Sequence, residues 1–195
     1  LNPFADVCVD APAFALSGGN PAGGTYSGPG VSGGNFDPSA AGVGTHTITY
    51  IYTNANGCSN SATNTITVNA LPNVTLDPFA DVCIDAAPFA LSGGNPAGGT
   101  YSGTGVSGGN FDPSVAGIGT FTITYIYTDG AGCTNSANNT ITVNPLPAKY
   151  NVTGGGSYCY GGVGTNVGLD GSDNGITYTL YLDGAPTTTT ASGNG

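Results

Sequence analysis

Alternation of apolar residues with threonine is the longest regular pattern in the chain. GTFTITYIYT (residues 119–128) has the period of two that is typical of a half-buried β-strand. NTITVN (139–144) alternates in the same way, and the polar segment TDGAGCTNSAN between the two predicts the loop of a β-hairpin. The residues expected on the inner face of the first strand are Phe121, Ile123, Tyr125 and Tyr127.

Shorter apolar segments are separated by turn residues. FALSGG and GGTYSG flank Asn20-Pro21-Ala22-Gly23, which has the residue preferences of a type I turn. The chain has no Glu, Gln, Arg, Met or Trp, and so good helix formers are scarce. Short strands joined by closely spaced turns predict an all-β fold made of small β-sandwiches.

The chain contains an internal repeat of 75 residues. Leu1 to Pro72 aligns without gaps with Leu76 to Pro147, and 58 of the 72 aligned residues are identical. ITVNALPNVTL and ITVNPLPAKYNVT then predict short, stiff, Pro-containing connectors, so that the domains form an extended array. We expect a first repeat over 1–71 with a truncated first strand, a second over 72–146, and over 147–195 the N-terminal part of a different, incomplete β domain.

Charge and hydropathy exclude several classes of function. The formal net charge is −10, and Lys149 is the only Lys or Arg, which argues against binding to nucleic acid or to an anionic membrane. No apolar run reaches the 18 residues of a membrane-spanning helix. His46 aligns with Phe121 and is therefore expected to be a packing residue. The chain has no second His, no Glu and no Arg, so an acid–base or nucleophilic site is hard to assemble. We therefore expect that the chain is not an enzyme.

The G-x-G-x-x-G spacing occurs in SGPGVSGGNFDP (27–38) and in SGTGVSGGNFDP (102–113). A dinucleotide site requires this motif to open a helix, whose N-terminal amides hold the pyrophosphate. Here an early proline and the absence of helical periodicity argue against such a site. The glycines Gly28, Gly30 and Gly33 are expected instead to shape tight turns, and Asp-Pro to start the next turn.

Five cysteines are the best candidates for structural chemistry. The repeat supplies one pair per domain, Cys8 with Cys58 and Cys83 with Cys133, and each pair would close a loop worth about 4 kcal/mol. Cys159 is expected to find its partner beyond the end of the chain. Buried free thiols are the alternative; a zinc site is disfavoured because there is no CxxC and only one His. Disulfides indicate an oxidising, extracellular location.

Aspartates near the predicted entrance of each domain are candidates for calcium ligands. They are Asp6 and Asp10 in the first repeat and Asp81 and Asp85 in the second. Carboxylate oxygens bind Ca²⁺, and calcium between tandem β domains would stiffen an array. The alternative is that they cap turns and keep the surface soluble. No D-x-D-x-D-G loop is present, so we predict no required cofactor, with calcium left open.

The repeat resembles a known family. VC(V/I)DA, FALSGGNPAGGTYSG(P/T)GVSGG, NFDPS, TITYIYT and NTITVN are similar to the Ig-like (PKD-like) repeats of giant surface adhesins that gliding and other bacteria export by type IX secretion. The resemblance covers both 75-residue copies, and NVTGGGSYCYGG resembles a module found beside them. It implies Ig-like domains in long extracellular stalks or filaments. Only the paired cysteines carry over, as structural elements.

Two classes of function follow from these observations. The first is a non-catalytic structural segment of an extracellular, cell-surface stalk or filament, whose partners are neighbouring repeats or other copies of the chain in a fibre. The second is a glycan-binding or accessory module of a larger secreted protein. Tyr26 and Tyr101 distinguish them: an open groove beside aspartates would favour glycan binding, and interior packing would favour a spacer.

Overall fold

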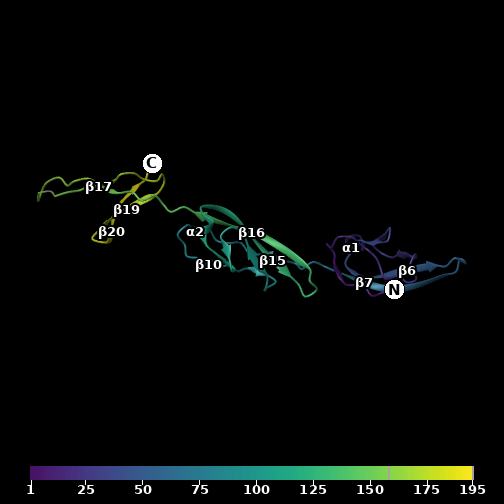
Figure 1. Cartoon of the computed structure of the whole chain (residues 1–195). Helices are drawn as coiled ribbons and strands as arrows, with labels where there is room; N and C mark the ends of the chain where they lie inside the picture. The colour runs from purple at the N-terminus through teal and green to yellow at the C-terminus, as the bar shows by residue number, and fades with distance from the viewer. Residues whose placement is uncertain (158, 195) are drawn as a thin grey trace. The chain divides into compact units, whose positions relative to one another are not determined.

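The computed structural model describes residues 1–157 and 159–194 (Figure 1). The chain divides into two compact units, Leu1–Asn144 and Pro145–Gly195. The first unit contains the first copy of the repeat and all but the last residues of the second, since it ends at Asn144. The boundary between the copies at residues 71 and 72 stays a prediction. In the described residues the only helices are two four-residue turns, which confirms the all-β fold class.

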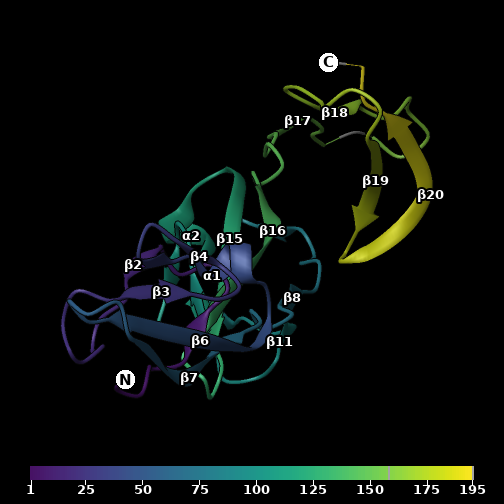
Figure 2. The same ribbon diagram turned by 90° about the vertical axis from the view of Figure 1, so that its right-hand side faces the viewer.

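The first repeat is built around one long hairpin (Figure 2). Two sheets form it, one with the strand order β1-β7-β6-β3 and the other with the order β2-β5-β4. The first strand runs parallel to β7, and the other pairs are antiparallel. The elements are β1 (Val7–Cys8), β2 (Phe14–Ala15), β3 (Thr25–Ser27), β4 (Val31–Ser32), β5 (Asn35–Phe36), α1 (Pro38–Ala41), β6 (Gly44–Thr53) and β7 (Ser59–Asn69).

The second repeat has the same two sheets, in the orders β12-β15-β16-β9 and β10-β14-β13, together with a two-stranded β8-β11 pair. The second strand of its hairpin is longer than the predicted strand over 139–144. It begins at Thr134 and includes the polar stretch TNSAN, which the sequence pattern assigns to the loop. The elements are β8 (Thr75–Leu76), β9 (Val82–Cys83), β10 (Phe89–Ala90), β11 (Gly94–Asn95), β12 (Thr100–Ser102), β13 (Val106–Ser107), β14 (Asn110–Phe111), α2 (Pro113–Ala116), β15 (Gly119–Thr128) and β16 (Thr134–Asn144).

Each repeat has its own hydrophobic core. Phe36 and Ile48 are fully buried in the first repeat, and their equivalents Phe111 and Ile123 are fully buried in the second. The alternation predicted for 119–128 is confirmed, since Ile123 and Tyr125 are buried while the threonines alternate outward. The remaining buried members of the two clusters are Leu16, Ile66 and Val68, and Leu91, Ile141 and Val143.

A buried tyrosine in each repeat fixes the turn that contains Asn-Pro. The hydroxyl of Tyr125 donates to the Pro96 carbonyl at 2.6 Å and accepts from the Gly99 amide at 2.7 Å. Tyr50 makes the same two contacts in the first repeat, with Pro21 and Gly24. The Asn20–Pro21 and Asn95–Pro96 peptide bonds within these turns are cis. Tyr125 therefore ties the turn to the long hairpin of the core sheet.

Substituting Tyr125→Phe is expected to lower the free energy of unfolding of the second repeat by about 1–3 kcal/mol. The ring would still fill its site, but the Pro96 carbonyl and the Gly99 amide would lose their common partner. Chemical denaturation followed by circular dichroism measures the change. Tyr127→Phe is the matched control, because Tyr127 is only half-buried on the same strand. Equal losses in the two variants would show that the hydroxyl of Tyr125 contributes no more than that of the half-buried Tyr127.

The C-terminal unit is formed by two separate two-stranded sheets. In Figure 2 the second hairpin of this unit is drawn as a long, curved strand, β20, beside the shorter strand β19. Large apolar side chains of this unit stay exposed, among them Leu182 on β19, with 67% of its surface accessible, and Val152 on β17, with 72%. The elements are β17 (Val152–Gly154), β18 (Val167–Leu169), β19 (Thr177–Leu182) and β20 (Ala185–Ser192).

Candidate functional site at the repeat junction

The tip of the long hairpin presents one cysteine in each repeat. Cys133 directly precedes β16, and its amide donates to the Asp129 side chain at 2.9 Å. The Asp129 amide in turn donates to the Cys133 carbonyl at 3.0 Å. Cys58 is held by Asn54 through the same two contacts, each at 3.0 Å. The tip is therefore folded by its own hydrogen bonds, whether or not its cysteine forms a disulfide.

The second cysteine of each repeat lies at the opposite end of the hairpin. Cys8 ends the short strand β1, which pairs in parallel with the last residues of β7, so that Cys8 is opposite Asn69. Cys83 ends β9 and is opposite Asn144 in the same way. Each of these cysteines thus lies beside the point where its repeat ends and the following connector begins.

One disulfide joins the two repeats. Cys8 is bonded to Cys133, at a Cα–Cα distance of 5.6 Å and a sequence separation of 125 residues. The connector between the repeats also contacts the second hairpin, because the Asn135 side chain donates to the Pro72 carbonyl at 2.9 Å. The Asn139 side chain donates to the Leu76 carbonyl at 3.2 Å, within the second repeat, since Leu76 ends β8. The junction is therefore held by a covalent bond, and the second hairpin holds the connector by a hydrogen bond.

The disulfide differs from the pairing expected within each repeat, Cys8 with Cys58 and Cys83 with Cys133. Cys58 precedes the first residue of β7, whereas Cys8 is opposite its last residue, Asn69. At about 3.3 Å per residue, the eleven steps from Cys58 to Asn69 separate the two cysteines by roughly 36 Å, far beyond the Cα–Cα limit of about 7 Å for a disulfide. The structure instead leaves Cys58 and Cys83 as exposed thiols.

Two further sequence-predicted groups lie apart from the junction bridge. Cys159 is an exposed thiol in the C-terminal unit, and its expected partner beyond the chain end stays a prediction. The calcium candidates Asp6, Asp10, Asp81 and Asp85 flank the short strands β1 and β9. Within the described residues no group of three or more His, Cys, Asp or Glu side chains is placed to hold a metal ion, so the structure adds no support for a calcium site at these positions.

The glycine-rich loop serves the fold. Gly28, Gly30 and Gly33 all have positive φ, of 149°, 71° and 56°. A Cβ at Gly30 would lie 2.7 Å from the Asp37 carbonyl oxygen and 2.7 Å from Ala41 Cβ, so the backbone approaches α1 too closely for any side chain. The loop leads into β5 and a four-residue helical turn, not into a long helix. It therefore lacks the row of helix N-terminal amides that a pyrophosphate site requires.

Gly30→Ala is expected to destabilise the first repeat more than Gly33→Ala. Both substitutions place a side chain at positive φ, but only Gly30 also meets backbone atoms, while a Cβ at Gly33 has nothing within 4 Å. Thermal unfolding of the two variants provides the comparison. We expect a loss of about 1 kcal/mol for Gly33→Ala and at least twice that for Gly30→Ala. Equal losses would remove the close approach to α1 as the reason for glycine at position 30.

Asp37 and Asp112 cap the two helical turns. The Asp37 carboxylate accepts from the Ser39 hydroxyl at 2.7 Å and from the Ser39 and Ala40 amides. The hydrogen bond from the Ser39 side chain is the main reason that the pKa of Asp37 is lowered, and Ser114 does the same for Asp112. Because the folded pKa lies below the unfolded value, the cap stabilises the repeat above the unfolded pKa, and this stability is lost as pH falls through the folded pKa. Asp-Pro is thus a helix-turn start, as its sequence predicts.

His46 is a packing residue, as its alignment with Phe121 predicts. Its ring lies 6.5 Å from that of Phe36, and its Nε2 is 2.7 Å from the Gly42 carbonyl oxygen. The side chain is half-buried on the inner face of β6. It therefore fills the position that Phe121 fills in the second repeat and adds one contact to the end of α1.

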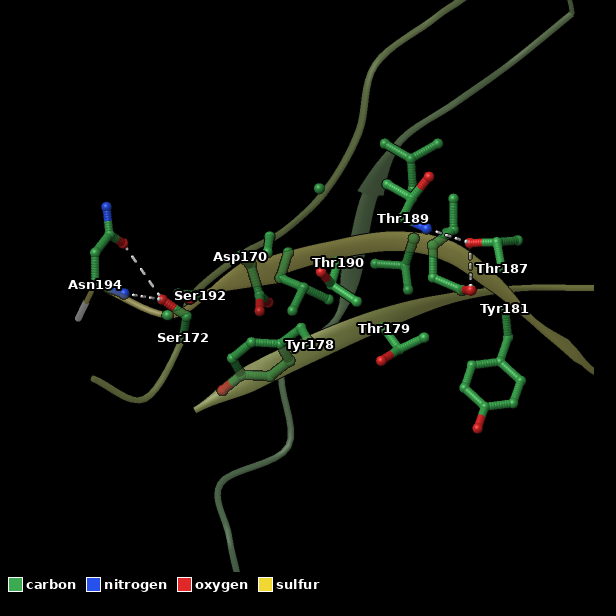
Figure 3. A pocket seen from close by; sticks show the side chains of 18 of the residues that line it. Asp170, Ser172, Tyr178, Thr179, Tyr181, Thr187, Thr189, Thr190, Ser192 and Asn194 are labelled. Carbon is green, nitrogen blue, oxygen red and sulfur yellow. Dashed lines mark hydrogen bonds between the residues drawn. The ribbon is translucent and has the colours of Figure 1, made fainter. Parts of the chain in front are cut away.

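A cleft of about 940 Å³ lies in the C-terminal unit, between its two hairpins (Figure 3). Apolar side chains and threonine hydroxyls line it, with Tyr178 and Asp170 at one end. Asp170 accepts from the Asn151 amide and from the Asn151 side chain, both at 2.7 Å; the side-chain bond is the first cause of its lowered pKa. This cleft has the mixture of apolar and hydroxyl groups that suits an uncharged polar or apolar ligand. No sequence motif points to it.

A tyrosine pair supports the same end of the cleft. Tyr150 donates to the Asp173 carboxylate at 2.8 Å, and this hydrogen bond is the main reason that the pKa of Tyr150 is raised. Tyr178 accepts from the Asp173 amide at 2.8 Å and meets the Tyr150 ring edge-on at 6.4 Å. Asp173 therefore orients both rings from one position.

Among the described residues no helix has the length and apolar character needed to cross a membrane.

Comparisons with known proteins find likeness in solved structures alone. No protein-family model matches the chain, and no curated protein matches it. A Ca²⁺-stabilized adhesin that helps an Antarctic bacterium reach out and bind ice is similar over 94% of this chain and 58% of its own, with 18% identity and a TM-score of 0.40. The Bacteroides ovatus protein SGBP-B of a mixed-linkage glucan utilization locus, in complex with a mixed-linkage heptasaccharide, is similar over 98% of this chain and 66% of its own, with 17% identity and a TM-score of 0.27. The chain thus spans less than two thirds of either structure's length, and at these TM-scores the likenesses carry no functional argument.

Proposed function

We propose that the chain is a non-catalytic structural segment of an extracellular surface adhesin, in which Ig-like repeats form a stalk or filament. The observation that carries this proposal is the Cys8–Cys133 bond, which links one repeat to the next. A disulfide between repeats adds nothing to a catalytic centre, but it limits the movement of one domain against another. The repeats are proposed as domains over 1–71 and 72–146, followed by part of a different domain over 147–195.

The packing of Tyr26 and Tyr101 supports a spacer. The Tyr26 ring lies 4.8 Å from that of Tyr50, and its hydroxyl accepts from the Gly19 amide at 2.8 Å. Tyr101 repeats this arrangement with Tyr125 and Gly94. Both rings pack against the hydrophobic cores, and neither hydroxyl is hydrogen-bonded to an aspartate. These tyrosines therefore hold the fold together and do not form a surface for glycan stacking.

The disulfide also supports the proposed location. Disulfides form and persist in oxidising compartments, and so the Cys8–Cys133 bond fits a secreted protein. The resemblance of both repeats to adhesins exported by type IX secretion agrees with a position at the bacterial cell surface. The proposed partners are neighbouring repeats and other copies of the chain.

Small-angle X-ray scattering of the whole chain, oxidised and then reduced, tests the stalk. In the oxidised chain the two repeats are expected to keep a fixed separation, and reduction is expected to broaden the distribution of distances between them without loss of β-structure by circular dichroism. Cys58→Ser is the matched control, because it removes an exposed thiol that is not in the bridge. Identical distributions before and after reduction would count against a linkage that stiffens the array.

Glycan binding is a second candidate, favoured by the cleft of the C-terminal unit. Tyr181 lines this cleft and is 60% exposed, and exposed aromatic rings stack on sugars. A glycan array probed with the chain and with Tyr181→Ala tests the idea. Saturable binding that Tyr181→Ala abolishes would establish a binding module, whereas an array without signal leaves the stalk as the function of the segment.

A further inference from the structure

The two exposed cysteines of the first unit are the unpaired halves of the bond seen between the repeats. Cys83 is equivalent to Cys8, and Cys58 is equivalent to Cys133, each at the repeat offset of 75 residues. Both Cys58 and Cys83 are exposed thiols. The chain therefore carries, on different repeats, the two complementary partners of a disulfide that it already forms once.

The local structures around the equivalent cysteines match. The Cys83 carbonyl accepts from the Ala86 amide at 3.0 Å, as the Cys8 carbonyl does from the Ala11 amide. Both cysteines end a two-residue strand in the same parallel register, opposite Asn144 and Asn69. No rearrangement of backbone is needed for Cys83 to present its sulfur as Cys8 does.

The hairpin tips match equally well. The Cys58 amide is held by Asn54 at 3.0 Å and the Cys133 amide by Asp129 at 2.9 Å, and in both tips a glycine amide closes the same turn. The residues that follow the Gly-Cys pair also agree: SNSA follows Cys58, and TNSA follows Cys133. A tip whose backbone is already folded loses little entropy when it binds a partner.

We propose that Cys58 of one copy of the chain forms a disulfide with Cys83 of a second copy, so that copies join end to end. The contact is heterologous, since the two partners lie on different surfaces, and such contacts propagate into linear assemblies. The proposal deepens the stalk function and rests on it. A low-molecular-weight disulfide supplies the oxidation. One protein thiolate attacks it, forms a mixed disulfide and releases one small thiol; the second protein thiolate then attacks the protein sulfur of the mixed disulfide and releases the other small thiol. Two protein thiols thus become one disulfide, and the small disulfide becomes two thiols.

Pairing of Cys58 with Cys83 inside one copy is disfavoured by distance. Within its own repeat each lies about one strand length, roughly 36 Å, from the cysteine of the junction bridge. The bridge and the contact of Asn135 with the connector restrain the repeats from folding back on each other. For a bond between Cys58 and Cys83, a second copy is therefore the partner that the geometry favours.

Mixing two variants of the whole chain, each of which lacks one of the two cysteines, tests the proposal. The chain is incubated at high concentration with oxidised and reduced glutathione, alkylated, and separated by non-reducing electrophoresis. Wild type is expected to give a ladder of covalent oligomers, and Cys58→Ser or Cys83→Ser alone is expected to give monomer. An equal mixture of these two variants is expected to give one covalent dimer, at least tenfold above either variant alone, and nothing larger. The reason is that each copy then supplies one half of the bond.

Mass analysis of peptic peptides identifies the bond and separates the possible failures. Dimers linked Cys58–Cys58, a Cys83–Cys159 bond, a ladder that survives Cys58→Ser, or monomer alone in the wild type would each overturn end-to-end joining. Cys159→Ser is the matched control and is expected to keep the ladder. If Cys8–Cys133 is intact while no ladder forms, only the joining of copies fails and the stalk proposal stands. If Cys8–Cys133 itself is absent, the stalk proposal fails with it.

Discussion

The stretch between Cys8 and Cys133 is expected not to extend when the oxidised chain is pulled from its two ends. Force enters at Leu1, crosses the disulfide, and continues from Cys133 along β16. The 125-residue separation between the two cysteines is bypassed, so only the residues outside the bridge can lengthen. Both hydrophobic cores draw most of their residues from inside this bypassed stretch. The bridge would therefore make the two-repeat segment almost inextensible.

Single-molecule force spectroscopy with tags at the chain ends measures this effect. After reduction the same molecule is expected to release up to roughly 400 Å of additional length, because an extended chain spans about 3.3–3.6 Å per residue and the bridge closes 125 of them. Cys8→Ser combined with Cys133→Ser is expected to give this length even under oxidising conditions. Cys58→Ser combined with Cys83→Ser is the matched control and is expected to behave as wild type. Full extension of the oxidised wild-type chain would mean that the bridge does not carry the load.

The bridge could not be predicted from cysteine counting, although part of the signal was present in the sequence. The hairpin was predictable from alternation, and TDGAGCTNSAN already places Cys133 in its loop. The position of Cys8 was not predictable, since it depends on the two-residue strand β1. This strand pairs in parallel with the last two residues of β7. Such a short strand has no periodicity of its own. Without it, one cysteine pair per repeat was the simpler hypothesis.

Other features were predictable because they are local. The inward face of 119–128 follows from a period of two, and the Asp-Pro turn follows from capping chemistry at Asp112. The start of β16 at Thr134 was missed because the strand begins in a polar stretch whose residues pair with β15 while staying largely outside the core. The cleft of the C-terminal unit was missed because it is formed by two hairpins with no recognisable motif. Local patterns therefore gave the strands and caps, whereas contacts between distant segments required the structure.

Phe111→Ala is expected to unfold the second repeat while the first stays folded. Phe111 is fully buried at the centre of a core whose members all lie between residues 76 and 143. Truncating a buried Phe costs about 3–5 kcal/mol, and a core in a domain of this size rarely supplies more than about 3–5 kcal/mol in total. The first repeat has its own core around Phe36. Its stability should therefore change little.

Hydrogen exchange read by mass spectrometry distinguishes the two repeats in one experiment. In Phe111→Ala, peptides from β15 and β16 are expected to lose protection, and those from β6 and β7 to keep it; Phe36→Ala should give the mirror image. Val115→Ala is the matched control, because Val115 is 70% exposed on α2 and its truncation should change the free energy of unfolding by less than about 0.5 kcal/mol. Loss of protection in both repeats of either Phe variant would show that the junction makes them one cooperative unit. In that case the Cys8–Cys133 bridge would couple folding as well as position, and the repeats could not act as independent modules of a stalk.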